Sequence, residues 1–175
     1  MAVPLLDNLP DHAQDHAPNQ MPDHMPDHMP DHPVAPAAPL GGPAPDPLAA
    51  AALAARARAY APYSHFAVGA AVRTPDGAIY AGCNVENAAY PEGTCAEAGA
   101  IAAMVLAGGR QVAELVVVGA GLCTPCGGCR QKLREFGGPN LAIRILDPSG
   151  TVLLRTTLGD LLPHSFGPET LQGPA

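Results

Sequence analysis

Two short stretches, TCAE at residues 94–97 and PCGGCR at residues 125–130, carry the strongest chemical signal in this sequence. Together they offer one leading thiol, a Cys-x-x-Cys pair, and a carboxylate two residues after the first thiol. A catalytic zinc site uses three protein ligands in a tetrahedral arrangement and keeps the fourth position for water or substrate. We therefore predict that Cys95, Cys126 and Cys129 bind one Zn²⁺ ion per subunit.

Both stretches are expected to begin helices, at residues 95–106 and 126–136. The N-terminus of a helix carries partial positive charge and free N–H groups, which favour a thiolate over a thiol. A Cys-x-x-Cys pair in the first turn also places its two sulfurs on one face of the helix. Glu97 follows Cys95 after one small residue, so we predict that its carboxylate lies beside the metal and moves protons without being a ligand.

Two other metal sites are compatible with these cysteines. Cys123 could complete a closed, structural zinc site, in which Glu97 would only face solvent. The spacing of Cys123, Cys126 and Cys129 also resembles part of an iron–sulfur sequence, although the nearby fourth cysteine of such a sequence is absent and a proline precedes Cys126. Both alternatives require Cys123 to join the cluster.

Charge is distributed unevenly along the 175 residues. The net charge of −7 comes from residues 1–47, which hold seven aspartates and no lysine or arginine, whereas residues 48–175 hold nine acidic and nine basic residues. A nucleic-acid surface should be basic, so we expect no nucleic-acid partner. We also expect no membrane span, because no run of about 18 apolar residues occurs.

The N-terminal stretch has a different composition from the rest of the chain. Met-Pro-Asp-His occurs three times in succession within residues 21–32, and a Pro/Ala/Gly-rich segment follows at residues 33–47. Frequent proline and little apolar surface prevent a packed core, so we predict a disordered tail at 1–47 and one domain at 48–175. The histidines of the tail could bind metal, or the repeat could be a solvated expansion without a role. No secretory signal is expected, and cysteines in ligand spacing indicate a reducing compartment, so the predicted localisation is cytoplasmic.

The remaining sequence predicts alternating helices and strands. Asp46-Pro47 is typical of a helix start, and residues 48–60 form an alanine-rich helical stretch. The expected strands are 66–74, 78–85, 114–119, 141–147 and 151–156, and the expected last helix is 158–162, followed by a frayed end at 167–175. The order α-β-β-α-β-α-β-β-α predicts an α/β fold, a three-layer α/β/α sandwich around a five-stranded mixed sheet.

Five segments of the domain resemble one family. The segments are PYSHF at 62–66, GCNVENAAY at 82–90, TCAE at 94–97, PCGGCRQ at 125–131 and LLPHSF at 161–166. From residue 60 to residue 166 the chain resembles the small, zinc-dependent, homotetrameric cytidine deaminases of pyrimidine salvage. The resemblance implies hydrolysis of cytidine and 2′-deoxycytidine to uridine and 2′-deoxyuridine with release of ammonia. In that reaction a zinc-held hydroxide attacks C4 of the base and Glu97 shuttles the proton.

The resemblance also implies substrate contacts. Phe66 would lie against the pyrimidine ring, and Asn84 and Glu86 would bind the ribose 3′-hydroxyl. Ala96, beside the leading cysteine, belongs to the same set. Without the resemblance, Phe66 is equally compatible with an ordinary core position, and Asn84 and Glu86 with solvated positions after a strand.

The family is homotetrameric with shared active sites, so three further residues would serve a neighbouring subunit. Ala88 and Tyr90 match positions that approach the ribose 5′ end, and Phe166 matches an aromatic residue that closes the base pocket. Cys83 and Cys123 are expected to behave as small buried hydrophobes. Ala98 departs from the pattern, because many relatives carry an arginine there that offsets thiolate charge. Arg130, backbone N–H groups and the two helix N-termini are the candidate replacements.

Three other functions share parts of this pattern. A deaminase of another cytosine-containing small molecule, such as a nucleoside antibiotic, would use much of the same site. A nucleic-acid-editing deaminase would need a basic groove for the strand. A zinc-stabilised interaction module without catalysis would need a closed site with four ligands.

Overall fold

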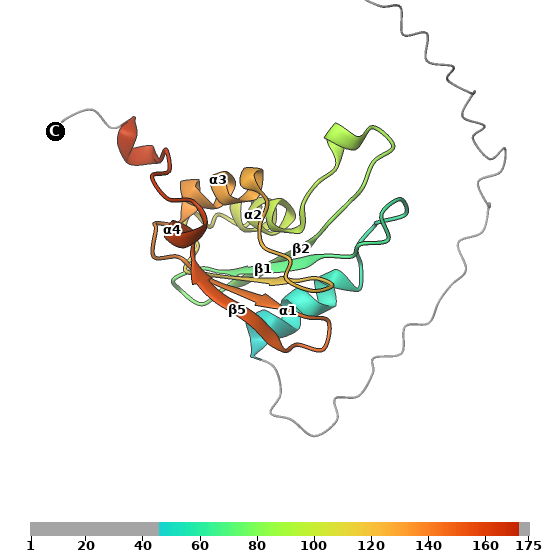
Figure 1. The fold of residues 1–175 in the computed structure, drawn as a ribbon. Coiled ribbons are helices and arrows are strands. Elements are labelled where there is room, and N and C mark those ends of the chain that lie inside the picture. The colour runs from blue at the N-terminus through green and yellow to red at the C-terminus, as the bar shows by residue number, and fades with distance from the viewer. Residues whose placement is uncertain (1–45, 172–175) are drawn as a thin grey trace, which may run out of the picture. The chain divides into compact units, whose positions relative to one another are not determined.

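The computed structural model describes residues 46–171, and the predicted tail therefore lies outside the described residues except for its last two positions. The helices and strands, in chain order, are α1 (Pro47–Arg56), β1 (Gly69–Arg73), β2 (Ile79–Cys83), α2 (Ala96–Leu106), β3 (Glu114–Val118), α3 (Gly127–Phe136), β4 (Ala142–Leu146), β5 (Val152–Thr157) and α4 (Leu158–Leu161). Two 3₁₀ helices, η1 (Tyr90–Glu92) and η2 (Pro168–Thr170), complete the set. The order of elements and the mixed five-stranded sheet confirm the predicted fold class (Figure 1).

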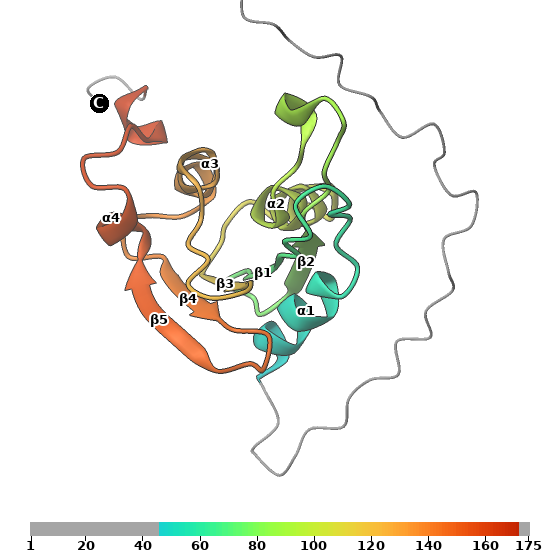
Figure 2. The same cartoon turned by 45° about the vertical axis from the view of Figure 1, so that its right-hand side comes forward.

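The sheet has the strand order β2-β1-β3-β4-β5. β3 and β4 run parallel, and the other three neighbouring pairs are antiparallel. Side chains alternate between the two faces of a strand, and β3 shows this directly: Leu115 and Val117 belong to one core, whereas Val116 and Val118 belong to another. α2 and α3 cover the first face and α1 covers the second (Figure 2). The sheet is therefore the middle layer of a sandwich.

α1 starts as its sequence predicts and ends earlier. The Asp46 carboxylate accepts hydrogen bonds from the N–H groups of Leu48 and Ala49 at 3.0 and 3.2 Å, and Pro47 occupies the first helical position. The helix ends at Arg56 rather than at residue 60, because Tyr60 pairs with the segment after β2. The N–H of Tyr60 donates to the carbonyl of Asn84 at 3.0 Å, and the carbonyl of Tyr60 accepts from the N–H of Glu86 at 2.8 Å. This pairing places the loop before β1 beside the segment that follows β2.

α2 lies unusually close to β2. A methyl group on Gly82 would lie 2.4 Å from the backbone nitrogen of Ala100 and 2.6 Å from the carbonyl oxygen of Ala96. Only glycine allows this contact, because no real Cβ atom approaches backbone that closely. Gly82 therefore fixes the distance between the sheet and the first turns of α2, which carry the predicted site.

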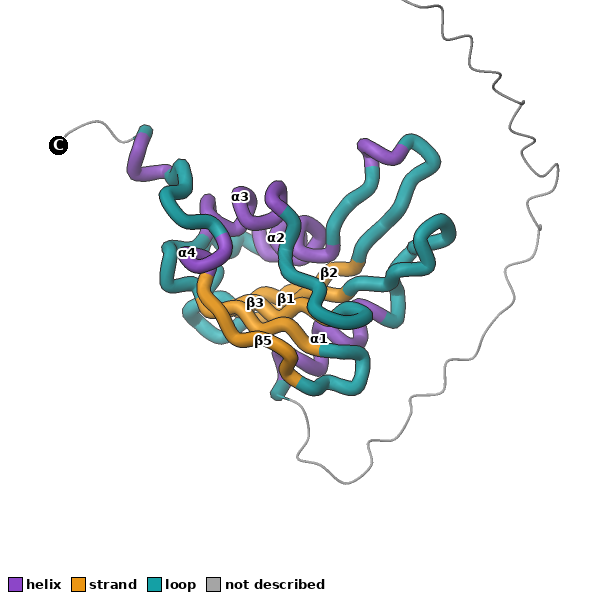
Figure 3. Tube along the Cα trace, in the orientation of Figure 1, coloured by secondary structure: helices purple, strands orange, loops and turns teal. Residues whose placement is uncertain are grey.

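The C-terminal end of the described region is more ordered than predicted. Pro168–Thr170 forms η2, and Glu169 pairs with Arg134 of α3, so the expected fraying at residue 167 is wrong for the residues that the structure describes. The loop between β2 and α2, which carries η1, projects away from the sheet (Figure 3). Among residues 46–171, none of the helices has the length and hydrophobicity needed to cross a membrane.

Candidate metal centre and substrate pocket

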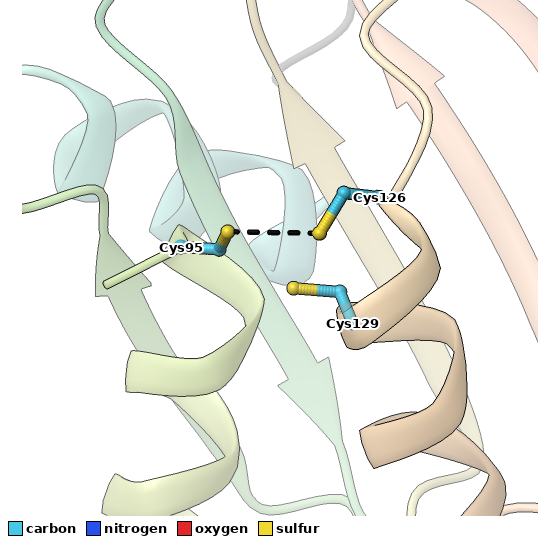
Figure 4. Close-up of side chains that lie close together, drawn as sticks. All are labelled: Cys95, Cys126 and Cys129. Atoms are coloured by element: carbon cyan, nitrogen blue, oxygen red, sulfur yellow. Dashed lines mark hydrogen bonds between the residues drawn. The ribbon is translucent and has the colours of Figure 1, made fainter. Parts of the chain in front are cut away.

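The three predicted ligands come together at the starts of two helices. Cys95 is the N-cap residue of α2, Cys126 is the N-cap residue of α3, and Cys129 lies in the first turn of α3. The Sγ atoms of Cys95 and Cys126 are 3.7 Å apart, and all three sulfurs lie within 4.8 Å of one another. The three side chains point toward a common centre (Figure 4).

This arrangement fits zinc. With Zn–S bonds of about 2.3 Å, tetrahedral geometry requires sulfurs about 3.8 Å apart, which matches the 3.7 Å between Cys95 and Cys126. No other His, Cys, Asp or Glu of residues 46–171 joins the cluster. Cys123 is therefore not a fourth ligand in this structure, and neither the closed zinc site nor the iron–sulfur site is supported. Three protein ligands are typical of a catalytic zinc site.

Without metal the three thiols have different pKa values. Burial is the main reason that the pKa of Cys129 lies far above its usual range, and burial raises the pKa of Cys95 as well. Burial acts in the same direction on Cys126, but hydrogen bonds from the backbone N–H of Cys129 and from the other two thiols outweigh it and lower its pKa. A metal ion binds the thiolates, so its binding must release protons from this cluster.

Glu97 lies in the first turn of α2, two residues from a metal ligand. Its side chain is 5% exposed and lines a pocket with Cys95 and Cys126. Burial raises the pKa of this carboxyl group, although its own backbone N–H, the Cys129 thiol and Lys132 act against the shift. A raised pKa brings a carboxyl group closer to neutral pH, where it can both accept and donate a proton. This placement is what a proton carrier requires.

The pocket beside the sulfurs has a volume of about 180 Å³. Its lining residues are Val68, Asn84, Cys95, Ala96, Glu97, Cys123, Thr124 and Cys126. Asn84 and Ala96, both predicted substrate contacts, are among them. Val68 and Thr124 also line the pocket and were not predicted from the sequence. Thr124 could have been suspected from its position two residues before Cys126. Cys123 is half-buried rather than buried, and it forms part of the pocket wall.

Asn84 also holds the neighbouring loop in place. Its Oδ1 accepts a hydrogen bond from the N–H of Val68 at 2.8 Å, and its Nδ2 donates to the carbonyl of Phe66 at 2.9 Å. The backbone N–H of Asn84 donates to the carbonyl of Val68 at 3.1 Å, but the Val68 N–H and the Phe66 carbonyl bind the Asn84 side chain and not a neighbouring strand. β1 accordingly begins at Gly69 and not at residue 66. Phe66 does not line the pocket, but its ring and Cys123 of the pocket wall both lie beside Gly119.

A second hollow of about 370 Å³ lies beside Glu86 and Tyr90. The Glu86 carboxylate accepts hydrogen bonds from the backbone N–H groups of Tyr63 and Ser64 at 2.9 and 3.2 Å, and from the Ser64 hydroxyl. The Ser64 hydroxyl is the main cause of the lowered pKa of Glu86. Glu86 therefore remains a carboxylate, and its hydrogen bonds connect the loop at Tyr63 and Ser64 to the segment after β2.

The other predicted contacts lie on exposed segments. Ala88 and Tyr90 belong to the projecting loop, and Tyr90 is 78% exposed, with its ring edge-to-face against Tyr63 at 6.1 Å. Phe166 follows α4 and is 57% exposed. None of these three residues lines the pocket of the described chain, so their assignment remains a prediction.

Arg130, one candidate for the role of the arginine missing at Ala98, hydrogen-bonds to the segment before Cys126 and to α4. Its guanidinium donates to the carbonyls of Pro125 and Leu161 at 2.7 and 2.8 Å and contacts the Thr124 hydroxyl at 3.4 Å. These bonds fix the loop before Cys126. The N-termini of α2 and α3 carry partial positive charge, and the backbone N–H of Cys129 bonds to Cys126, so both remain candidates beside Arg130.

Comparison with known proteins supports this interpretation. A family model described as the cytidine and deoxycytidylate deaminase zinc-binding region matches residues 46–144. The chain belongs to this deaminase family. Within the family, the cytidine deaminase of Sporosarcina psychrophila is 43% identical over 119 residues, which cover 67% of this chain and 87% of that protein. The cytidine deaminase of Mycobacterium tuberculosis is 45% identical, over 67% of this chain and 85% of its own.

Solved structures of deaminases show the same fold. The crystal structure of cytidine deaminase from Burkholderia pseudomallei matches with a TM-score of 0.64 and 48% identity, covering 68% of this chain and 96% of that one. A cytidine deaminase structure from Mycobacterium tuberculosis matches with a TM-score of 0.61 and 43% identity, covering 69% and 94% of the two chains. The resemblance to this family expected from the sequence is confirmed.

Proposed function

We propose that this deaminase hydrolyses cytidine and 2′-deoxycytidine to uridine and 2′-deoxyuridine and releases ammonia. One observation carries the proposal: three converging sulfurs lie beside the buried carboxyl group of Glu97 in a small pocket. The relatives named above are cytidine deaminases, which supports the same substrate here.

Cys95, Cys126 and Cys129 would hold the zinc ion. Bound zinc supplies Lewis acidity, which lowers the pKa of a water molecule to about 7 and makes it a nucleophile at neutral pH. Glu97 accepts the proton of the attacking water and passes it to N3 of the pyrimidine ring. It then takes the second proton of that water, from the hydroxyl group formed on C4, and delivers it to the amino group that leaves from C4, so that one water is consumed and one ammonia is released. Its burial keeps bulk water away from these transfers.

The pocket and the second hollow support a nucleoside rather than a nucleotide. Asn84 of the pocket and Glu86 of the hollow lie two residues apart on one segment. The hollow is lined by the Glu86 carboxylate and, among the described residues, by no lysine or arginine. A phosphate group would be repelled there, whereas a sugar hydroxyl can donate to a carboxylate. Deoxycytidylate is therefore a poorer candidate than deoxycytidine.

We assign the remaining substrate contacts as the resemblance implies. Phe66 and Phe166 would enclose the base, Asn84 and Glu86 would bind the ribose, and Ala96 would line the base pocket. Ala88 and Tyr90 would reach the sugar of a neighbouring subunit in a homotetramer with shared sites. Tyr90 and Phe166 are exposed in the single chain, so both side chains are accessible to a neighbouring subunit. Sedimentation of the zinc-loaded protein tests it, and a stable monomer with full activity would contradict it.

Two further assignments concern the whole chain. We place the catalytic domain at residues 48–175, after a tail at residues 1–47 whose last two residues, Asp46 and Pro47, begin α1. We regard the residues before Asp46 as having no catalytic function. A chain that begins at Asp46 keeps the N-cap of α1, so it should retain zinc and turnover. We also place the protein in the cytoplasm, since three thiols must remain reduced to bind metal.

An ammonia-release assay tests the proposed activity. The zinc-loaded protein is given cytidine, 2′-deoxycytidine, deoxycytidylate, cytosine, a cytosine nucleoside antibiotic and single-stranded DNA. We expect fast turnover of the first two compounds only. Preferred turnover of the antibiotic or of the DNA would replace this proposal with one of those functions, and no turnover of any compound would favour a non-catalytic zinc module.

A further inference from the structure

The C-terminal segment of the described chain, residues 163–171, lies along α3 and is called the strap here. Three side chains of α3 bind the strap or the residues just before it. Arg130 donates to the carbonyl of Leu161 at 2.8 Å, and Gln131 donates to the carbonyl of Phe166 at 3.0 Å. Arg134 donates to the Ser165 hydroxyl at 3.0 Å and forms an ion pair with Glu169. Polar contacts thus follow one side of α3 for more than a turn.

Arg134 is the central member of this group. It is 7% exposed, which is rare for a charged side chain, and its guanidinium lies across the backbone of Gly167. A Cβ atom at that glycine would lie 2.2 Å from Nη2 of Arg134. The guanidinium therefore contacts alternate residues of the strap: it binds Ser165, packs on Gly167 and pairs with Glu169.

Apolar burial contributes little to the position of the strap. Its two large apolar side chains, Phe166 and Leu171, are 57% and 77% exposed. Hydrophobic stabilisation scales with the apolar area removed from water, at about 25 cal/mol per Å², so these two side chains do not anchor the segment. A buried guanidinium, in contrast, requires its partners, because an unpaired charge in that position is strongly destabilising.

We propose that Arg134 is a positioning residue, which fixes the strap on α3 and thereby sets the direction of the Phe166 ring. The same helix begins after Cys126 and carries Cys129. Arg134 therefore holds Phe166 in a fixed position relative to α3, which supplies two of the predicted metal ligands. The consequence for catalysis rests on the proposed function, in which Phe166 covers the base in a neighbouring subunit. Arg134 acts through Phe166 and does not touch the substrate itself.

The test compares Arg134→Met with Arg155→Met in the full-length, zinc-loaded protein. Arg155 is an exposed arginine on β5 and provides the same chemical change away from the strap. Hydrogen–deuterium exchange is measured for peptides that cover residues 163–171 and 126–133. In Arg134→Met we expect exchange of the Thr170 and Leu171 amides, which close the turn of η2, to become at least tenfold faster, with the α3 peptide unchanged. Unchanged exchange in the strap would overturn the proposal.

Kinetics on cytidine supply the second measurement. Arg134→Met should raise KM several-fold, with kcat within about twofold of the parent, and Phe166→Ala should have the same effect. The double variant should be no worse than Phe166→Ala alone. Arg134→Lys keeps a positive charge for Glu169. Its KM should therefore lie between the values of Arg134→Met and the parent protein. A KM unchanged in Arg134→Met but raised in Phe166→Ala would overturn the proposal.

Two outcomes separate this inference from the proposed function. If Phe166→Ala leaves KM unchanged, the proposed role of Phe166 fails, and strap exchange alone then decides whether Arg134 positions the segment. If Arg134→Met does not fold, Glu169→Gln replaces it, because Glu169 is exposed and glutamine keeps a polar partner for the buried guanidinium while the ion pair is lost. That variant should also accelerate strap exchange, and unchanged exchange would again overturn the proposal.

Discussion

Asn84 and Phe66 are joined by a hydrogen bond in which the side-chain amide of Asn84 donates to the backbone carbonyl of Phe66 at 2.9 Å. The same amide accepts from the N–H of Val68 at 2.8 Å, so one side chain holds two residues of a loop that borders the pocket. The residue proposed to bind the ribose therefore also shapes the wall against which the base would lie. Its two roles can be separated by substitution.

Asn84→Ala should destabilise the domain by about 1–3 kcal/mol, because the N–H of buried Val68 loses its partner. Asn84→Asp keeps an acceptor for the Val68 N–H, so it should lose less stability than Asn84→Ala. It places a carboxylate against the carbonyl of Phe66, so it should raise the KM for cytidine. Urea unfolding and steady-state kinetics on cytidine measure both effects. Asn140→Ala, at an exposed position, is the control. Equal stability of Asn84→Ala and the control would show that the two side-chain hydrogen bonds of Asn84 contribute nothing to the stability of the domain.

Glu97→Gln should lower kcat by about 10²–10⁴-fold, the usual contribution of a positioned acid–base group. Zinc content should remain near one ion per chain, because the structure places Glu97 outside the sulfur cluster. Metal analysis and single-turnover assays check both points. If turnover survives in a zinc-loaded Glu97→Gln protein, another group must move the proton.

Cys129→Ser should abolish zinc retention after dialysis, because Cys129 is the buried member of the cluster and a hydroxyl is a poor substitute for a thiolate ligand. Cys83→Ser is the matched control, since its thiol donates to the carbonyl of Arg58 and lies outside the cluster. The control should keep its metal. Loss of zinc from both variants would indicate a general effect of cysteine removal.

Gly82→Ala should destabilise the domain by about 1–3 kcal/mol, because the added methyl group meets backbone atoms of α2 at 2.4–2.7 Å. Relief requires α2 to move away from β2, and this movement displaces Cys95 and Glu97 together. We therefore expect kcat to fall in the folded fraction as well. Gly138→Ala, where a Cβ meets nothing within 4 Å, should change neither quantity.

Asp46 makes the stability of the folded domain depend on pH in the acidic range. A hydrogen bond from Arg144, at 2.5 Å, is the main reason that the pKa of Asp46 falls from 3.8 to about 2. A group whose pKa is lower in the folded protein stabilises it above its unfolded pKa, and this contribution is lost as the pH falls from about 4 toward 2. Asp46→Asn keeps an N-cap, so it should be less stable than the parent at pH 7 and equally stable near pH 2. A constant difference across this range in urea titrations would contradict the assignment.

Local patterns were sufficient to predict the metal centre. The Cys-x-x-Cys pair, the leading cysteine and Glu97 each owe their position to the first turn of a helix, and helix starts are visible in a sequence. α2 and α3 begin as predicted, and α3 ends at Phe136, also as predicted. The strand expected at residues 114–119 is likewise found, as β3.

Contacts between distant residues account for what the sequence did not predict. The two side-chain hydrogen bonds of Asn84 join residues 16 and 18 positions apart, and the Arg134–Glu169 ion pair joins residues 35 positions apart. Nothing in the local pattern around residue 167 distinguishes a frayed end from an ordered one. In the same way, α1 stops at Arg56 because Tyr60 finds a partner in Val85, which no helix propensity of residues 48–60 could indicate.

The ion pairs of Asp46 have a practical consequence for labelling and immobilisation. Asp46 contacts Arg73 and Arg144, where α1 meets the sheet on the face that α2 and α3 do not cover. A dye, bead or fusion partner attached just ahead of Asp46 therefore joins the domain across the sheet from the sulfur cluster. We expect such conjugates to remain accessible to small molecules at the opposite face.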